Sequence, residues 1–244
     1  MSRESDVAEA DDKQRVYARL AGALFLGEVV LAIGSGLIID HVAGHGGFAE
    51  TAATIAAAEH LYRAALSIVV IVSLSSALLA FSQYAVLKPV NSLIAQLAMI
   101  FSLGDSFLAL LVRMFRFVIV HLYVSARAVG TGTVSTEAAV DLLRAMASTT
   151  ENIGGIAFGI GSFLFFWLFF KSRYIPRALS ALGVFASAIW SGLYFANLLF
   201  PEQHGVFQDI CLPPMALADV LTGFYLIRFG IRTQARRERG PAIA

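Results

Sequence analysis

Three acidic residues, Glu28, Asp105 and Asp219, fall inside long apolar stretches of the sequence. A carboxylate at the centre of a lipid bilayer costs roughly 2.5–3.5 kcal/mol on insertion scales, so it usually faces protein or water rather than lipid. Counting at 1.5 Å per residue places Asp105 and Asp219 at a similar depth, about 10 Å below the outer membrane surface. Two carboxyl groups that met there could hold a proton, as in a proton-coupled transporter or an intramembrane acid. The alternative interpretation is that neutral or hydrogen-bonded carboxyl groups join the helices.

The five histidines are the second group with possible chemistry. Under the topology derived below, all of them lie on the outer side of the membrane, together with several acidic residues. Imidazoles near carboxylates can bind zinc or copper, or respond to external pH. Their spacing does not match a metal-ligand motif, so we favour exposed loop residues, with no metal and no cofactor. These candidates are His41, His45, His60, His121 and His204.

Two arginines, Arg113 and Arg116, directly follow an apolar stretch. In a helix Arg116 shares a face with Asp105 but lies ~16 Å further along the axis, too far for direct contact. We expect both guanidinium groups to anchor the outer end of this helix to lipid headgroups, with anion binding as the alternative.

A GxxxG pattern, formed by Gly155 and Gly159, lies in another apolar stretch. In a membrane helix this spacing lets a second helix backbone approach closely. We expect packing within the bundle, and a contact in a homo-oligomer is the second possibility.

The composition indicates that these residues belong to an integral membrane protein. Of the 244 residues, 58% are apolar and only 14% are charged, whereas charged residues make up about a quarter of a soluble domain. This excludes an ordinary cytosolic enzyme. The single cysteine excludes an internal disulfide framework. The arginines near the C-terminus have no folded basic surface beside them, so nucleic-acid binding is not expected.

Six apolar stretches have the length of membrane-spanning helices, because ~20 helical residues cross a hydrocarbon core ~30 Å thick. The predicted fold is an all-α, polytopic membrane helical bundle. It forms a single membrane domain over residues 17–229, between a polar cytoplasmic N-terminal segment (1–16) and a basic cytoplasmic tail (230–244). The helices are expected near residues 20–39, 64–86, 90–112, 153–170, 178–199 and 211–227.

The distribution of Lys and Arg predicts the orientation, because basic residues accumulate in cytoplasmic loops. With the N-terminus inside, most basic residues are cytoplasmic, including those of the tail, which can contact anionic lipid. Both termini are therefore expected in the cytoplasm. No apolar run suits a cleaved signal peptide, so none is expected. The basic residues left on the outer side are Arg63, Arg113, Arg116, Arg127 and Arg144.

The longest outer loop, residues 121–150, is expected to contain one amphipathic helix. Ala139, Leu142, Leu143 and Met146 share one face of this helix, and its charged side chains point elsewhere. We expect it to lie on the outer membrane surface or to cover the bundle.

Three short segments at helix ends resemble a known bacterial family. They are Tyr17-Ala18-Arg19-Leu20-Ala21-Gly22, Tyr84-Ala85-Val86-Leu87-Lys88-Pro89-Val90-Asn91 and Phe170-Lys171-Ser172-Arg173-Tyr174-Ile175-Pro176-Arg177. This pattern is similar to the multi-pass membrane family catalogued as domain of unknown function 4386, over roughly residues 17–227. The resemblance implies a bacterial inner-membrane protein of about six or seven helices. It implies no activity and no catalytic residues.

Short loops, without a nucleotide motif or a catalytic constellation, favour a non-enzymatic bundle with a structural, sensing or partner-binding role. The first alternative is a small-solute or proton-coupled transporter that uses Glu28, Asp105 and Asp219. The second is an intramembrane enzyme on a lipid-soluble substrate, with outer histidines as bases. The lipid bilayer is the expected partner, and a homo-oligomer or a membrane partner protein are further possibilities.

Overall fold

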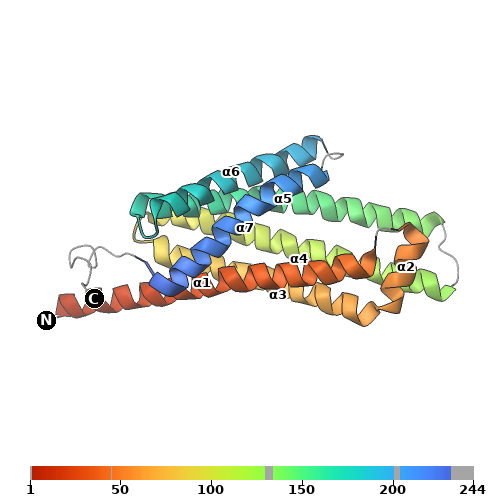
Figure 1. Cartoon of the computed structure of the whole chain (residues 1–244), viewed down its shortest axis with the longest axis horizontal. Coiled ribbons are helices and arrows are strands. Elements are labelled where there is room, and N and C mark those ends of the chain that lie inside the picture. The colour runs from red at the N-terminus through yellow and green to blue at the C-terminus, as the bar shows by residue number, and fades with distance from the viewer. Residues whose placement is uncertain (1, 45, 130–133, 201–203, 232–244) are drawn as a thin grey trace.

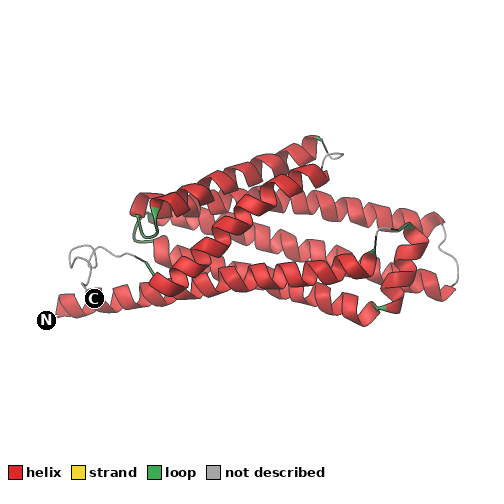
Figure 2. Cartoon of the chain, viewed as in Figure 1, coloured by secondary structure: helices red, strands yellow, loops and turns green. Residues whose placement is uncertain are grey.

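The chain forms a bundle of long helices. The computed structural model describes residues 2–44, 46–129, 134–200 and 204–231, and these residues are helical apart from short turns (Figure 2). In this part of the chain the helices are α1 (Ser2–Ala43), α2 (Phe48–Ala57), α3 (Glu59–Leu87), α4 (Ser92–Val129), α5 (Val134–Ser172), α6 (Arg177–Leu199) and α7 (His204–Phe229).

The six long helices run alternately in opposite directions, and neighbours in sequence pack side by side (Figure 1). The exception is α7, which crosses the bundle diagonally and contacts both α6 and α1. The last turns of α7 therefore return to the end of the bundle where α1 begins. There Leu226 and Ile231 share a buried apolar cluster with Ala18 and Ala21 of α1.

Five helices in the described part of the chain are long and apolar enough to cross a membrane: α1, α3, α4, α5 and α6. Their outer surfaces fit this role, since large apolar side chains such as Phe107 (72% exposed) point away from the bundle. The sixth predicted stretch, residues 211–227, lies within α7, which is not among these five candidate spans over its described residues. This helix contains Asp219, Arg228 and two internal prolines.

The expected separate amphipathic helix in the outer loop is not formed. Residues 134–147 instead make up the first part of α5, and α4 continues to Val129 beside them. At 38 and 39 residues, these helices are each ~57 Å long, nearly twice the ~30 Å of a hydrocarbon core. Not all the residues expected on its apolar face pack against the bundle: Leu142 and Met146 are 64% and 43% exposed, whereas Val140 and Ala147 are buried.

A short helix that the sequence reasoning did not include, α2, covers this outer end of the bundle (Figure 1). It contacts α4 and buries Thr51, Ala52 and Ile55. Ile55 belongs to an apolar cluster with Tyr123 and Val140, which is distinct from the larger core cluster around Phe165, Phe166 and Phe169. The molecule thus has a part with the apolar spans, which we call the membrane part, and a separately packed end around α2, which we call the outer end after the orientation expected from the sequence.

Candidate functional site

Glu28 lies on the inward face of α1, on the same side as Ala21 and Phe25, and is half-buried. Its two carboxylate oxygens lie 3.0 Å from the hydroxyl of Ser75 and 2.9 Å from that of Ser76, both on α3. Each hydroxyl also lies near a second acceptor, the backbone carbonyl of Val72, at 2.8 and 3.1 Å. Because a serine hydroxyl has one proton to donate, each serine can donate either to Glu28 or to its own helix.

Asp219 lies on α7 where this helix crosses α1. The crossing point is marked by Gly22 and Gly223: a Cβ atom on Gly22 would lie 2.8 Å from the carbonyl oxygen of Gly223. The helices run antiparallel, so Asp219 is ~6 Å and Glu28 ~9 Å from this point towards the outer end, at nearly the same depth. The two carboxyl groups interact electrostatically.

The carboxyl group of Asp219 is poorly solvated. Its Oδ1 is inaccessible to solvent and has no hydrogen-bond partner among the described residues, and the same is true of the hydroxyl of Thr222, one turn later on α7. An ionised carboxylate in such surroundings is costly, because neither water nor a protein donor compensates its charge. This position therefore favours proton binding over a permanent charge.

Asp105 lies on α4 against α5. Its Oδ1 is 3.1 Å from the position that a Cβ atom on Gly154 would occupy, so the absence of a side chain on Gly154 makes room for the carboxyl group. Asp105 interacts electrostatically with Glu28 on one side and with Arg113 and Glu151 on the other. Glu28, rather than a direct meeting of Asp105 and Asp219, is thus the group that connects the three acids.

The two arginines of α4 lie at the outer end of this series. The guanidinium group of Arg116 lies 3.2 Å from a carboxylate oxygen of Glu151 on α5. Arg113 interacts electrostatically with both Glu151 and Asp105. These arginines were expected to anchor the helix to lipid headgroups. The contact of Arg116 with an acidic residue was not expected. Glu151 was missed because it lies just before the apolar stretch 153–170. Only the antiparallel hairpin of α4 and α5 shows that it lies at the same depth as Arg113.

These groups form a row through the bundle, which we call the charge row: Asp219, Glu28, Asp105, Arg113, Glu151 and Arg116. Of these described residues, Arg116 and Glu151 are in direct contact, and each of the other members lies within electrostatic range of the next without a hydrogen bond between them. On α4 the row rises ~16 Å from Asp105 to Arg116. It is contributed by α1, α4, α5 and α7, and it joins the middle of the bundle to the outer end. Within it, the carboxyl groups of Asp219, Glu28 and Asp105 are the groups that can bind and release protons.

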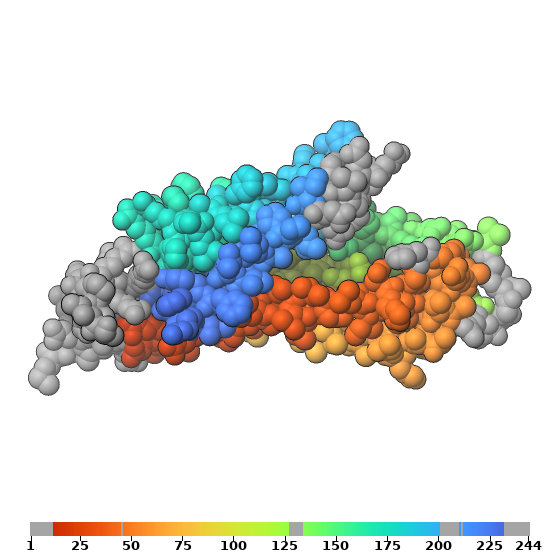
Figure 3. Space-filling view, in the orientation of Figure 1, coloured from red at the N-terminus to blue at the C-terminus, as the bar shows by residue number. Residues whose placement is uncertain are grey.

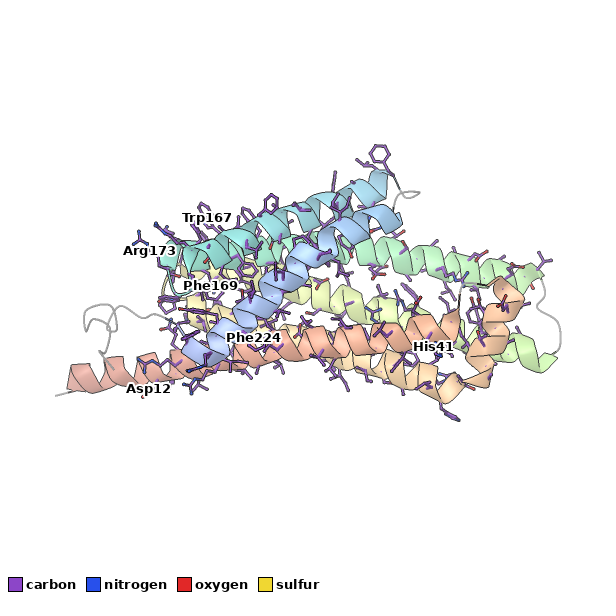
Figure 4. All side chains as sticks on the ribbon, in the orientation of Figure 1. Asp12, His41, Trp167, Phe169, Arg173 and Phe224 are labelled. Atoms are coloured by element: carbon purple, nitrogen blue, oxygen red, sulfur yellow. The ribbon has the colours of Figure 1, made fainter. Side chains whose placement is uncertain are left out.

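The predicted histidine candidates do not join the charge row. His41, His60 and His121 are exposed near the outer end, and Figure 4 shows His41 at the opposite end of α1 from Asp12. His45 and the side chain of His204 lie outside the described residues. Among the described residues, no three His, Cys, Asp or Glu side chains are grouped as metal ligands would be.

The two glycines of the GxxxG pattern face α6. A Cβ atom on Gly155 would lie 2.3 Å from the ring of Tyr194, and one on Gly159 would lie 2.6 Å from Cβ of Ser191. The hydroxyl of Ser191 donates to the carbonyl of Ile156 across the same contact. At these positions the two helices approach too closely for a side chain on α5.

The comparisons with known proteins identify a family and no activity. No curated protein and no solved structure is significantly similar to the chain. The profile of one family, described as "Domain of unknown function (DUF4386)", matches residues 20–230, which include all the members of the charge row. The chain therefore belongs to this family of multi-pass helical membrane proteins.

Proposed function

We propose that the protein is a proton-coupled transporter of a small solute in the bacterial inner membrane. The observation that carries the proposal is the pair formed by Asp219 and Glu28, two carboxyl groups at one depth on two crossing helices, one with a buried oxygen that has no described partner. Burial and a neighbouring like charge both favour the neutral form of a carboxyl group, so this pair favours at least one bound proton over two negative charges.

The topology that this proposal needs has six membrane-spanning helices, with α7 as the sixth. The alternating directions of the long helices support it, since α1 begins and α7 ends at one end of the bundle (Figure 1). Arg173 lies at this same end as Asp12 (Figure 4), and Lys88 and Arg177 also lie in turns or helix ends there. By the positive-inside rule, these basic residues support assigning this end to the cytoplasm.

The serines beside Glu28 provide a way for the site to respond to a proton. When Glu28 is ionised, Ser75 and Ser76 donate to its carboxylate and join α1 to α3. When Glu28 is neutral it is a weaker acceptor, and the hydroxyls can donate to the carbonyl of Val72 instead, since both acceptors are within reach. Proton binding thus loosens one helix contact without leaving a hydroxyl unpaired.

The helix best placed to move in response is α7. It lies on the surface of the bundle and packs on α1 and α6 (Figure 3). It contains Pro213 and Pro214, which remove backbone hydrogen bonds and make a helix easier to bend. A proton gained or lost at Asp219 would change the contact of α7 with α1 and so could alternate access to a solute path.

A structural or partner-binding role is the second candidate. It is favoured by the two serine hydrogen bonds to Glu28 and the ion pair of Arg116 with Glu151, which are what acids that merely join helices would form. The two candidates differ in what happens when the acids are neutralised. A transporter with neutralised acids no longer moves protons across the membrane. A structural or partner-binding bundle keeps its fold and its partners, because it never moved protons.

The test uses the purified full chain in liposomes that contain a pH-sensitive dye. Small solutes of different charge are added outside, and proton movement is recorded with and without an imposed membrane potential. For at least one solute we expect proton uptake that Asp219→Asn and Glu28→Gln abolish. The matched control is Asp40→Asn, which neutralises an exposed acid near the other end of α1 and should keep full uptake.

A second measurement detects the protons without any solute. Infrared difference spectra over a pH titration report the C=O stretch of protonated carboxyl groups. We expect Asp219→Asn and Glu28→Gln each to remove part of the pH-dependent band, while Asp40→Asn retains the band of the buried acids. Spectra and solute-driven uptake that are identical in all variants would contradict the proposal and favour the structural role.

A further inference from the structure

A groove opens between α6 and α7 near the cytoplasmic end of the bundle. The two helices contact each other, but α7 turns away from α6 as it crosses towards α1 (Figure 1). The first turns of α6 and the last turns of α7 are therefore spread apart. The space between them has a volume of about 560 Å³, within the ~300–1,000 Å³ typical of sites for small ligands.

The lining of this groove is apolar along its length and positive at one end. Leu179 and Leu182 of α6 face Leu221 and Phe224 of α7, and Arg228 is the charged side chain among the described lining residues. The lining contains no described acidic residue that would neutralise Arg228. The guanidinium group of Arg228 lies over the ring of Phe229, at 5.6 Å from its centroid.

The positive end of the groove lies where the membrane surface is expected. Arg228 is in the last turn of α7, and the groove begins at Pro176, beside Arg177. Lys171 in the last turn of α5 and Arg173 in the turn that follows it are both exposed. The groove thus extends from a basic surface into the apolar layer, which is the shape of a phospholipid with its headgroup at the surface.

We propose that this groove binds an anionic phospholipid of the cytoplasmic leaflet, with one acyl chain between α6 and α7 and the phosphate beside Arg228. Basic pockets between membrane helices on the cytoplasmic side have the chemistry that recognises anionic headgroups. Charge complementarity decides the lipid class, because a zwitterionic headgroup offers Arg228 no net negative charge. The proposal is independent of proton coupling, since the groove contains no member of the charge row.

The volume of the groove argues against a helix from a second copy of the chain as its occupant, because about 560 Å³ holds little more than one turn of a helix. A helix with its side chains is ~10–12 Å wide, and it would bring further bulky side chains against Arg228. An acyl chain is narrow and flexible, and it needs no hydrogen-bond partner from the apolar lining. A lipid in this position would also fix the angle between α6 and α7.

The experiment measures binding of phosphatidylglycerol and phosphatidylcholine to the full chain in detergent, with bound lipids counted by native mass spectrometry. We expect tighter binding of phosphatidylglycerol. Arg228→Gln should weaken it about five-fold, the effect of one basic residue near an anionic headgroup. Lys88→Gln removes the same charge from the exposed turn between α3 and α4, and it should change binding by less than about two-fold.

A second pair of variants tests the acyl-chain part of the groove. Ala178→Phe adds bulk to an exposed residue of the lining, and Ala181→Phe adds the same bulk to an exposed residue of α6 outside it. We expect Ala178→Phe to weaken binding at least about ten-fold, because displacing two buried methylene groups already has this effect. Ala181→Phe should leave it unchanged.

Three results would overturn the proposal. The first is equal binding of the two lipids. The second is the same loss in Arg228→Gln and Lys88→Gln, which would mean general attraction to a basic surface. The third is that Ala178→Phe does not weaken lipid binding, or that it breaks up a dimer of the chain while lipid binding stays the same.

Discussion

The outer end and the membrane part of this bundle hold their acidic residues in opposite ways. At the outer end, Arg116 pairs with Glu151 and Arg63 pairs with Glu59 at 2.7 Å. In the membrane part, Glu28 has two serine hydroxyls as neighbours and Asp219 has a buried oxygen without a described partner. The difference follows the surroundings, since ions are readily accommodated where water reaches and costly where it does not.

The two regions also differ in what joins their helices. Side-chain interactions contribute at the outer end, where Arg144 hydrogen-bonds the hydroxyl of Tyr123 and Phe48 of α2 packs on the Tyr123 ring. In the membrane part the closest contacts are made by glycines, such as Gly22 on Gly223. Lipid surrounds apolar side chains as well as protein does, so close backbone packing replaces the hydrophobic effect as the source of stability there.

The largest effect that tests this comparison is expected at the crossing of α1 and α7. Gly22→Leu would place a side chain against the backbone of Gly223, so α7 must shift. We expect a loss of ~1–3 kcal/mol in the free energy of unfolding, as for an overpacked core. The measurement is unfolding by SDS in mixed micelles.

The matched control for this prediction is Gly27→Leu on the same helix. A Cβ atom on Gly27 would have no neighbour within 4 Å, and leucine is a better helix former than glycine by up to ~1 kcal/mol. This variant should therefore be as stable as the unmodified protein or more so. Equal losses in the two variants would show that close backbone packing does not stabilise the membrane part.

The expectations from sequence succeeded where hydropathy decides the outcome. Among the described residues the all-helical fold is confirmed, and five of the six expected apolar spans are found as helices able to cross a membrane. The family is confirmed as well, with a match over residues 20–230. Apolar stretches alone do not determine how far a helix continues into water, so residues 134–147 were predicted as a separate helix although they extend α5.

The candidate site could be predicted only in part, because its geometry depends on helix directions. Glu28, Asp105 and Asp219 are conspicuous in sequence as acids in apolar stretches. Counting residues along helices perpendicular to the membrane places Asp105 and Asp219 at a similar depth, where they could meet. The diagonal course of α7 instead brings Asp219 to Glu28, and no local pattern encodes that course. Ser75 and Ser76 were missed, since hydroxyls are common in membrane helices and usually bond to their own backbone.

A smaller effect is expected at the ion pair of the outer end. Glu151→Gln removes the charge that Arg116 contacts at 3.2 Å, with both side chains about one-third exposed. We expect a loss of up to ~1 kcal/mol in the free energy of unfolding, the upper end for partly exposed pairs. The difference should shrink at high salt, because salt screens such pairs.

Glu137→Gln is the control for this pair, since Glu137 is an exposed residue of the same helix and its neutralisation should change stability by less than about 0.5 kcal/mol. If Glu151→Gln were as harmless as Glu137→Gln, the ion pair would contribute nothing measurable. The contrast between the two regions would then concern packing alone.

The smallest effect on stability is expected for Asp219→Asn. Asparagine has nearly the shape of a neutral aspartic acid, and Oδ1 of Asp219 has no described hydrogen bond that the substitution would break. We expect a change of less than about 0.5 kcal/mol in the free energy of unfolding, measured in the same micelles at neutral pH. An acid retained to join helices should instead cost at least as much to neutralise as Glu151. A variant that folds as well as the unmodified protein but no longer moves protons would show that Asp219 serves function rather than stability, whereas a large loss of stability would place it with the structural ion pairs of the outer end.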